Sequence, residues 1–137
     1  QPNDVPAPTP VPGDPALPTT TGAKLDLAVQ HMQAGRHVAA RAVLKEAIAS
    51  GAGAPELAEL RYRYAETFAN TGEHAAAISE FDKVTKEFPR SDWACWSYYR
   101  AGESFDKLGK SGKVFYQGAT EGVCAKSDAA KEAKKKL

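Results

Sequence analysis

The side chains in this sequence with the clearest capacity for chemistry are three histidines, His31, His37 and His74, and two cysteines, Cys95 and Cys124. Such side chains bind zinc when they recur at short spacings such as HExxH or CxxC, because one helix turn or tight loop then presents two ligands together. The sequence contains neither spacing. We therefore expect no metal site and no cofactor, and we interpret the histidines as structural.

Two glutamates, Glu66 and Glu103, could resemble a catalytic acid–base pair. However, neither a GxSxG nucleophile motif nor a glycine-rich phosphate loop accompanies them. The two residues are 37 positions apart, which is also the spacing of a repeated pattern in the chain. They are better explained as charges that recur on one face of a repeated structure, and we expect no enzymatic activity.

The elements that must position these residues are helices. From Ala23 onward the chain is rich in Ala, Leu, Lys, Glu and aromatic residues, and apolar residues recur at steps of three and four. Gly35, Gly72 and Gly109 are spaced by 37 and 37, and a glycine between two periodic runs ends the first helix. The same offset relates Tyr62 to Tyr99, Arg63 to Arg100, Glu66 to Glu103, and Phe68 to Phe105.

This repetition predicts three helix–turn–helix units, at about residues 23–54, 55–90 and 91–124. A closing helix is expected over residues 127–137, with Ser127 as its N-cap. Residues 1–22 hold seven of the nine prolines and no aromatic residue, so neither a helix nor a central strand is expected there. We predict a disordered, proline-rich linker, which is either a tail without a role or a tether to an upstream anchor.

The second unit resembles the tetratricopeptide repeat, through Ala65, Phe68, Gly72, Ala77, Phe81, Val84 and Pro89. The first unit matches with Ala28, His31, Gly35, Ala40, Leu44 and Ala47, and the third with Gly102, Phe105 and Gly109. The resemblance covers residues 23 to about 124. It implies an all-α fold: a right-handed superhelical stack of three hairpins and a C-terminal capping helix.

The third unit is the one that departs most from this pattern. Its second helix is expected within residues 111–124, with Val114, Gly118 and Glu121 at the packing positions. Glycines weaken a helix by about 1 kcal/mol each relative to alanine. Cys95 opens the first helix of this unit and Cys124 closes the second, so antiparallel helices would bring them within bridging range. We predict a disulfide, which would indicate an oxidising compartment; the alternative is two buried, reduced cysteines.

The resemblance implies a concave groove that binds a partner protein or peptide. The positions that face such a groove are occupied by Glu59, Tyr62, Glu66 and Asn70, then Trp96, Tyr99, Glu103, Asp106 and Lys107, with Arg63 and Arg100 alongside. Large aromatic residues and arginines dominate binding hot spots. We expect Tyr62, Trp96 and Tyr99 to anchor the partner, and Arg63 and Arg100 to meet its acidic groups. The alternative is that the closing helix and the proline-rich segment fill this face.

The sequence also resembles, more loosely, the C-terminal repeat domain of the TolA-binding cell-division-coordinator family and tetratricopeptide lipoproteins of the bacterial outer membrane. This implies an interaction scaffold in the periplasm or anchored to the outer membrane, with membrane tethering through a segment upstream of Gln1. A cytoplasmic adaptor is the alternative, although Leu25 and Val29 replace two residues of the carboxylate clamp of such adaptors. A small-ligand-binding or enzymatic helical domain is a further alternative. The net charge of +1 favours no nucleic-acid partner, and the C-terminal KEAKKK run is interpreted as a solvated helix end.

Overall fold

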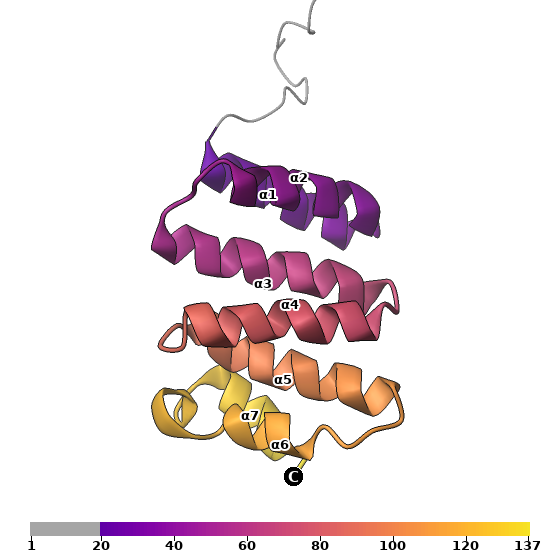
Figure 1. Cartoon of the computed structure of the whole chain (residues 1–137), viewed down its shortest axis with the longest axis vertical. Coiled ribbons are helices and arrows are strands. Elements are labelled where there is room, and N and C mark those ends of the chain that lie inside the picture. Colours follow the sequence, from indigo (N-terminus) through magenta and orange to yellow (C-terminus); the bar gives the residue numbers. More distant parts are fainter. Residues whose placement is uncertain (1–19) are drawn as a thin grey trace, which may run out of the picture.

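A computed structural model describes residues 20–137 and shows helical hairpins stacked one on another (Figure 1). The helices in this part of the chain are α1 Thr21–Gln33, α2 His37–Ala49, α3 Ala54–Asn70, α4 His74–Glu87, α5 Asp92–Lys107, α6 Lys113–Gly118 and α7 Asp128–Lys134, with a short 3₁₀ helix, η2 Gly122–Cys124. The expected all-α hairpin stack is therefore confirmed. None of these helices has the combination of length and apolarity needed to cross a bilayer.

The first helix begins earlier than the sequence pattern indicated. The side chain of Thr20 accepts a hydrogen bond from the backbone N–H of Ala23 at 3.1 Å, and this cap starts α1 at Thr21. The last three residues of the predicted linker, 20–22, thus form the cap and first turn of α1. The remainder of that prediction, residues 1–19, lies outside the described residues.

The repeated glycines make the hairpin turns, as the sequence predicted. Gly35, Gly72 and Gly109 have φ values of +79°, +82° and +79°, in the left-handed region that L-residues with a side chain rarely adopt. Each turn leads directly from the first helix of a hairpin to the second. The first two hairpins also have the expected small residues where their helices cross, since Ala28, Ala40, Ala65 and Ala77 are all fully buried.

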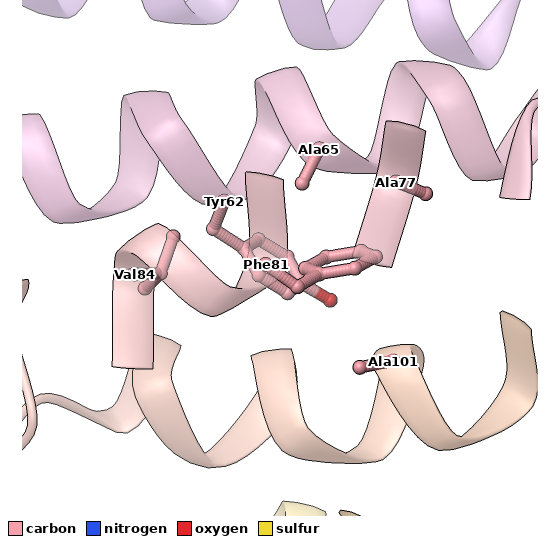
Figure 2. Close-up of a cluster of buried hydrophobic side chains, with 6 residues drawn as sticks. All are labelled: Tyr62, Ala65, Ala77, Phe81, Val84 and Ala101. Carbon is pink, nitrogen blue, oxygen red and sulfur yellow. The ribbon is translucent and has the colours of Figure 1, made fainter. Parts of the chain in front are cut away.

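Bulky side chains fill the space between the hairpins. Leu44 from α2 and Phe81 from α4 are both fully buried. Figure 2 shows Phe81 and the ring of Tyr62 lying between the backbones of α3 and α5, with Val84 and Ala101 in the same cluster. This cluster packs the second hairpin against the third.

The first helices of the hairpins form the inner side of the stack. Helices α1, α3 and α5 contact their neighbours in this series directly, whereas α2, α4 and α6 show no comparable contact with one another. Closer packing on one side of a stack of hairpins bends the stack toward that side. The concave face is therefore the face of α1, α3 and α5, on which the sequence placed the partner-binding residues.

The third hairpin departs from the expected helix over residues 111–124. Helix α6 ends at Gly118, and the chain continues through a turn into η2. Val114, which was expected to pack, is 73% exposed, and Tyr116 is buried in its place. The reason is a closer crossing than in the other hairpins: a Cβ atom on Gly112 would lie 2.2 Å from the carbonyl oxygen of Gly102. The backbones meet at these two glycines, which shifts the buried side of α6.

The two cysteines form the predicted disulfide. Cys95 on α5 and Cys124 in η2 are bonded, with their Cα atoms 5.4 Å apart. Both are buried together with Ala129 of the closing helix. The predicted N-cap of that helix is also confirmed, because the side chain of Ser127 accepts a hydrogen bond from the N–H of Ala130 at 3.0 Å. The disulfide thus fixes the segment from which α7 begins.

Candidate functional site

A row of alternating charges joins α3 to α5 on the concave face. Glu66 lies at its centre, with Oε1 3.0 Å from a terminal nitrogen of Arg63 and Oε2 3.6 Å from Nε of Arg100. The row extends through ion pairs of Arg63 with Glu59 at 3.3 Å and of Arg100 with Glu103 at 3.0 Å. These residues recur at helical spacings of three and four, so each helix presents its charges on one face. We call these five residues the concave charge row.

The pairing within the row corrects one expectation. Arg63 and Arg100 were expected to meet the acidic groups of a partner, but both guanidinium groups already face carboxylates of this chain. Arg100 also donates a hydrogen bond to the side-chain oxygen of Asn70 at 3.0 Å. With three carboxylates and two guanidinium groups, the concave charge row has a net charge of −1. A partner carboxylate would have to displace an existing ion pair.

Tyr62 is a core residue rather than an open residue of the groove. Its exposed fraction is 4%, and its ring contacts those of Phe81 and Trp93, with centroids 5.7 and 5.2 Å away (Figure 2). Burial raises the pKa of its phenol, and the adjacent Glu66 carboxylate raises it further. Tyr62 therefore stays neutral and supports the concave face from beneath, so its expected role as an exposed anchor requires correction.

Trp96 and Tyr99 lie half-buried at the C-terminal end of the same face. Their rings meet edge to face, with centroids 5.8 Å apart. Both pack against the buried cluster of Cys95, Cys124 and Ala129, and Tyr99 also packs beside Tyr116 of α6. Burial raises the pKa of Tyr99, with a smaller contribution from the charge of Glu103. The closing helix thus covers part of the predicted aromatic site without burying it fully.

Trp93 is an aromatic residue of this region that the repeat pattern did not indicate. Its ring lies below the guanidinium of Arg63, 5.1 Å from the ring centroid, in a geometry suited to a cation–π interaction. Trp93 precedes the first position of the third unit, where the repeat has no characteristic residue. The only sequence signal was its spacing of three from Trp96, which places the two indoles on adjacent turns of α5.

Asp106, expected in the groove, instead caps the next helix. Its carboxylate accepts hydrogen bonds from the backbone N–H of Gly112 at 2.9 Å and from the hydroxyl of Tyr116 at 2.6 Å. These bonds, the one from Tyr116 first, lower the pKa of Asp106. Asp106 therefore orients the short helix α6 on α5, a structural role that the sequence spacing did not reveal.

Two of the three histidines, His31 and His74, have local hydrogen-bond partners. Nδ1 of His31 accepts a hydrogen bond from Nε of Arg36 at 3.0 Å, and Nδ1 of His74 lies 3.1 Å from the hydroxyl oxygen of Ser104. Residues 20–137 contain no group of three or more His, Cys, Asp or Glu side chains that could hold a metal ion. The side chains brought together on this face can therefore bind through charge, hydrogen bonds and aromatic surface.

A model of the tetratricopeptide repeat family matches residues 31–94. The match runs from the last turn of α1 to the first turn of α5, and so includes the whole second hairpin. No curated protein matches the sequence.

Proposed function

Because residues 31–94 belong to the tetratricopeptide repeat family, whose repeats form protein-interaction modules, we propose that this chain is a non-enzymatic scaffold that binds a partner polypeptide on its concave face. The binding region consists of Trp96, Tyr99, Asn70 and the concave charge row. The partner is an extended or helical peptide segment of another protein.

The observation that carries this proposal is the position of Trp96 beside the concave charge row. The indole is half-buried and rests on the disulfide cluster, so its orientation is fixed before a partner arrives. A rigid aromatic ring with part of its area exposed loses little conformational entropy on binding. Arg100 of the row follows Trp96 by four residues on α5, so a charged group lies on the same side of the helix as the indole, as in an apolar anchor with polar residues at its edge.

Because the charges of the row are already paired, we expect a partner whose affinity comes from several hydrogen bonds and apolar contacts rather than from one ion pair. Both arginines are held by glutamates, so their guanidinium groups are pre-oriented but partly satisfied. Such a surface selects among partners by the positions of their hydrogen-bonding groups. A partner gains most by bonding to the remaining guanidinium N–H groups and to the exposed side chain of Asn70. An apolar side chain on the partner would then cover Trp96.

We also propose that the scaffold works in the bacterial envelope, in the periplasm or tethered to the outer membrane. The support is the buried Cys95–Cys124 bond, because structural disulfides persist in oxidising compartments and are rare in the bacterial cytoplasm. The looser resemblance to envelope repeat proteins agrees with this placement. Alkylation of intact cells followed by a gel-shift assay tests it: a bridged pair in the native host supports the envelope, and two alkylated thiols favour the cytoplasmic adaptor.

Site-directed photocrosslinking in the native host tests the binding face. A photoreactive residue at position 96 is expected to form a specific adduct with the partner, whereas one at Ser79, which is exposed on α4, is expected to form none. Both variants must retain wild-type helical content, as measured by circular dichroism. Equal adducts from both positions would contradict the assignment of the concave face.

A further inference from the structure

An apolar hollow outside the concave charge row opens at the edge of the stack where α4 gives way to α5. It has a volume of about 530 Å³ and is lined by Pro55, Ala58, Glu87, Phe88, Pro89, Arg90, Ser91, Asp92 and Trp93. The apolar part of this lining includes two prolines, a phenylalanine and a tryptophan. Grooves lined by aromatic side chains bind proline-rich segments, because the polyproline conformation is already extended and loses little entropy on docking.

We propose that the proline-rich residues 1–19 of this chain bind in the hollow formed by Pro55, Phe88 and Trp93. These residues contain seven of the nine prolines, together with Val5, Val11 and Leu17 as apolar side chains. The hollow adjoins the concave charge row at Trp93, whose ring also lies under Arg63. Binding of residues 1–19 there does not require a partner protein.

The point at which this segment joins the fold supports binding within one molecule. A side chain starting at Gly22 would lie 3.9 Å from a carboxylate oxygen of Glu56, so the first turn of α1 is next to the first turn of α3. Pro55, the neighbour of Glu56, forms one wall of the hollow. Figure 1 shows the start of α1 and the connections α2–α3 and α4–α5 along the same edge of the stack.

The length of the segment and its linkage to the fold favour the chain's own residues over a free peptide. Nineteen residues in an extended polyproline form reach roughly 60 Å, at about 3.1 Å per residue, which is ample for a hollow beside the attachment point. A short tether gives an effective concentration on the order of millimolar, so even a weak contact is well occupied. A peptide on another protein has no such advantage.

The rim of the hollow offers one exposed cation to this acidic segment. Residues 1–19 carry Asp4 and Asp14 and no lysine or arginine. At the rim of the hollow the cation Arg90 is exposed, whereas Glu87 is paired with Arg61 at 3.3 Å. The other acidic rim residue, Asp92, lies in the first turn of α5, where the helix dipole offsets its charge.

Paramagnetic relaxation enhancement in the full chain tests the proposal. A nitroxide is attached at Thr9→Cys, which provides the only free thiol because Cys95 and Cys124 are bonded. We expect selective loss of the NMR signals of the Trp93 indole and the Ser91 amide, with no loss at Val38 on α2. The matched control carries the same label and length, but has serine in place of Pro6, Pro8, Pro10, Pro12, Pro15 and Pro18.

In that control the signals of Trp93 and Ser91 are expected to return, and Arg90→Glu should restore them in part. Equal signal loss with the serine control would show that the tether alone brings the label near, and would overturn the proposal. Absence of any loss at Trp93 would do the same. Loss in a mixture of unlabelled ¹⁵N chain and spin-labelled ¹⁴N chain would assign the contact to a second copy, contrary to binding within one molecule.

Discussion

Arg100 on α5 lies 3.6 Å from Glu66 on α3, and this ion pair links the second hairpin to the third across the concave face. Both side chains are largely covered, with exposed fractions of 23% and 14%. Ion pairs gain more when they are shielded from solvent and arranged in a network than when they are fully exposed.

A double-mutant cycle with Glu66→Ala and Arg100→Ala measures this coupling. We expect a coupling free energy of about 1 kcal/mol in urea unfolding, decreasing as salt is added. The control is the exposed pair Lys86 and Asp82 on α4, for which a smaller coupling is expected because solvent screens both charges. Equal coupling for the two pairs would show that the concave charge row is no more than a set of surface ion pairs.

The disulfide is expected to be the main support of the C-terminal third of the fold. It closes a loop of 29 residues, and the chain-entropy relation then gives about 3–4 kcal/mol of stabilisation. Reduction should lower the free energy of unfolding by that amount and should loosen η2 and α7 before the first two hairpins. The double variant Cys95→Ala/Cys124→Ala serves as control, since its stability should not respond to reductant. Unchanged protection of α7 from hydrogen exchange after reduction would contradict this role.

Asp106 should make the stability of the third hairpin depend on pH. Its pKa is lowered in the folded state, so its stabilising effect is present above the ordinary carboxyl pKa of about 4 and is lost as pH falls through the folded pKa. Asp106→Ala is expected to cost about 1–2 kcal/mol at pH 7, and this difference from the wild type should narrow below pH 4. Tyr116→Phe removes only one of the two bonds and should give a smaller loss. A difference that stays constant down to pH 3 would exclude the capping role of the ionised carboxylate.

Gly112 should be intolerant of any side chain. A Cβ atom there would lie 2.2 Å from a backbone oxygen of Gly102, and backbone atoms cannot move aside as a flexible side chain can. Gly112→Ala is expected to lower the free energy of unfolding by about 1–3 kcal/mol or more. Gly22→Ala is the matched control, because it meets only an ordinary contact at 3.9 Å and gains helix propensity, so it should be neutral or slightly stabilising. Equal stability of the two variants would refute the close crossing.

The sequence predicted the first two hairpins well because their pattern is local. Gly35 and Gly72 form the left-handed turns, and Ala65 and Ala77 allow the two helices of the second hairpin to cross closely. Each of these positions requires a particular residue type, so the sequence pattern reveals it. The third hairpin was predicted less well because two local contacts override the repeat pattern there. The contact of Gly102 with Gly112 and the bonds of Asp106 shift α6, and neither effect follows from the repeat spacing.

In the candidate site, too, positions within one helix were predictable from the sequence, whereas contacts between helices were not. Helical spacing predicted that Glu66 and Arg63 share one face of α3, and their ion pair at 3.0 Å agrees with this, since it depends only on position within a helix. The burial of Tyr62 depends on Trp93 and Phe81, which come from two other helices. The pairing of Arg100 with Glu66 likewise depends on how two hairpins dock. Such contacts between helices require the three-dimensional structure.

The affinity of the crosslinked partner for Trp96→Ala tests the central claim most directly. The partner, identified through position 96, is titrated by calorimetry against the wild type, Trp96→Ala and Val38→Ala, the last altering a side chain that is 71% exposed on α2. We expect Trp96→Ala to weaken binding at least about tenfold, with helical content unchanged and Val38→Ala binding as the wild type does. Wild-type affinity for Trp96→Ala, in a protein that remains folded, would contradict partner binding on the concave face.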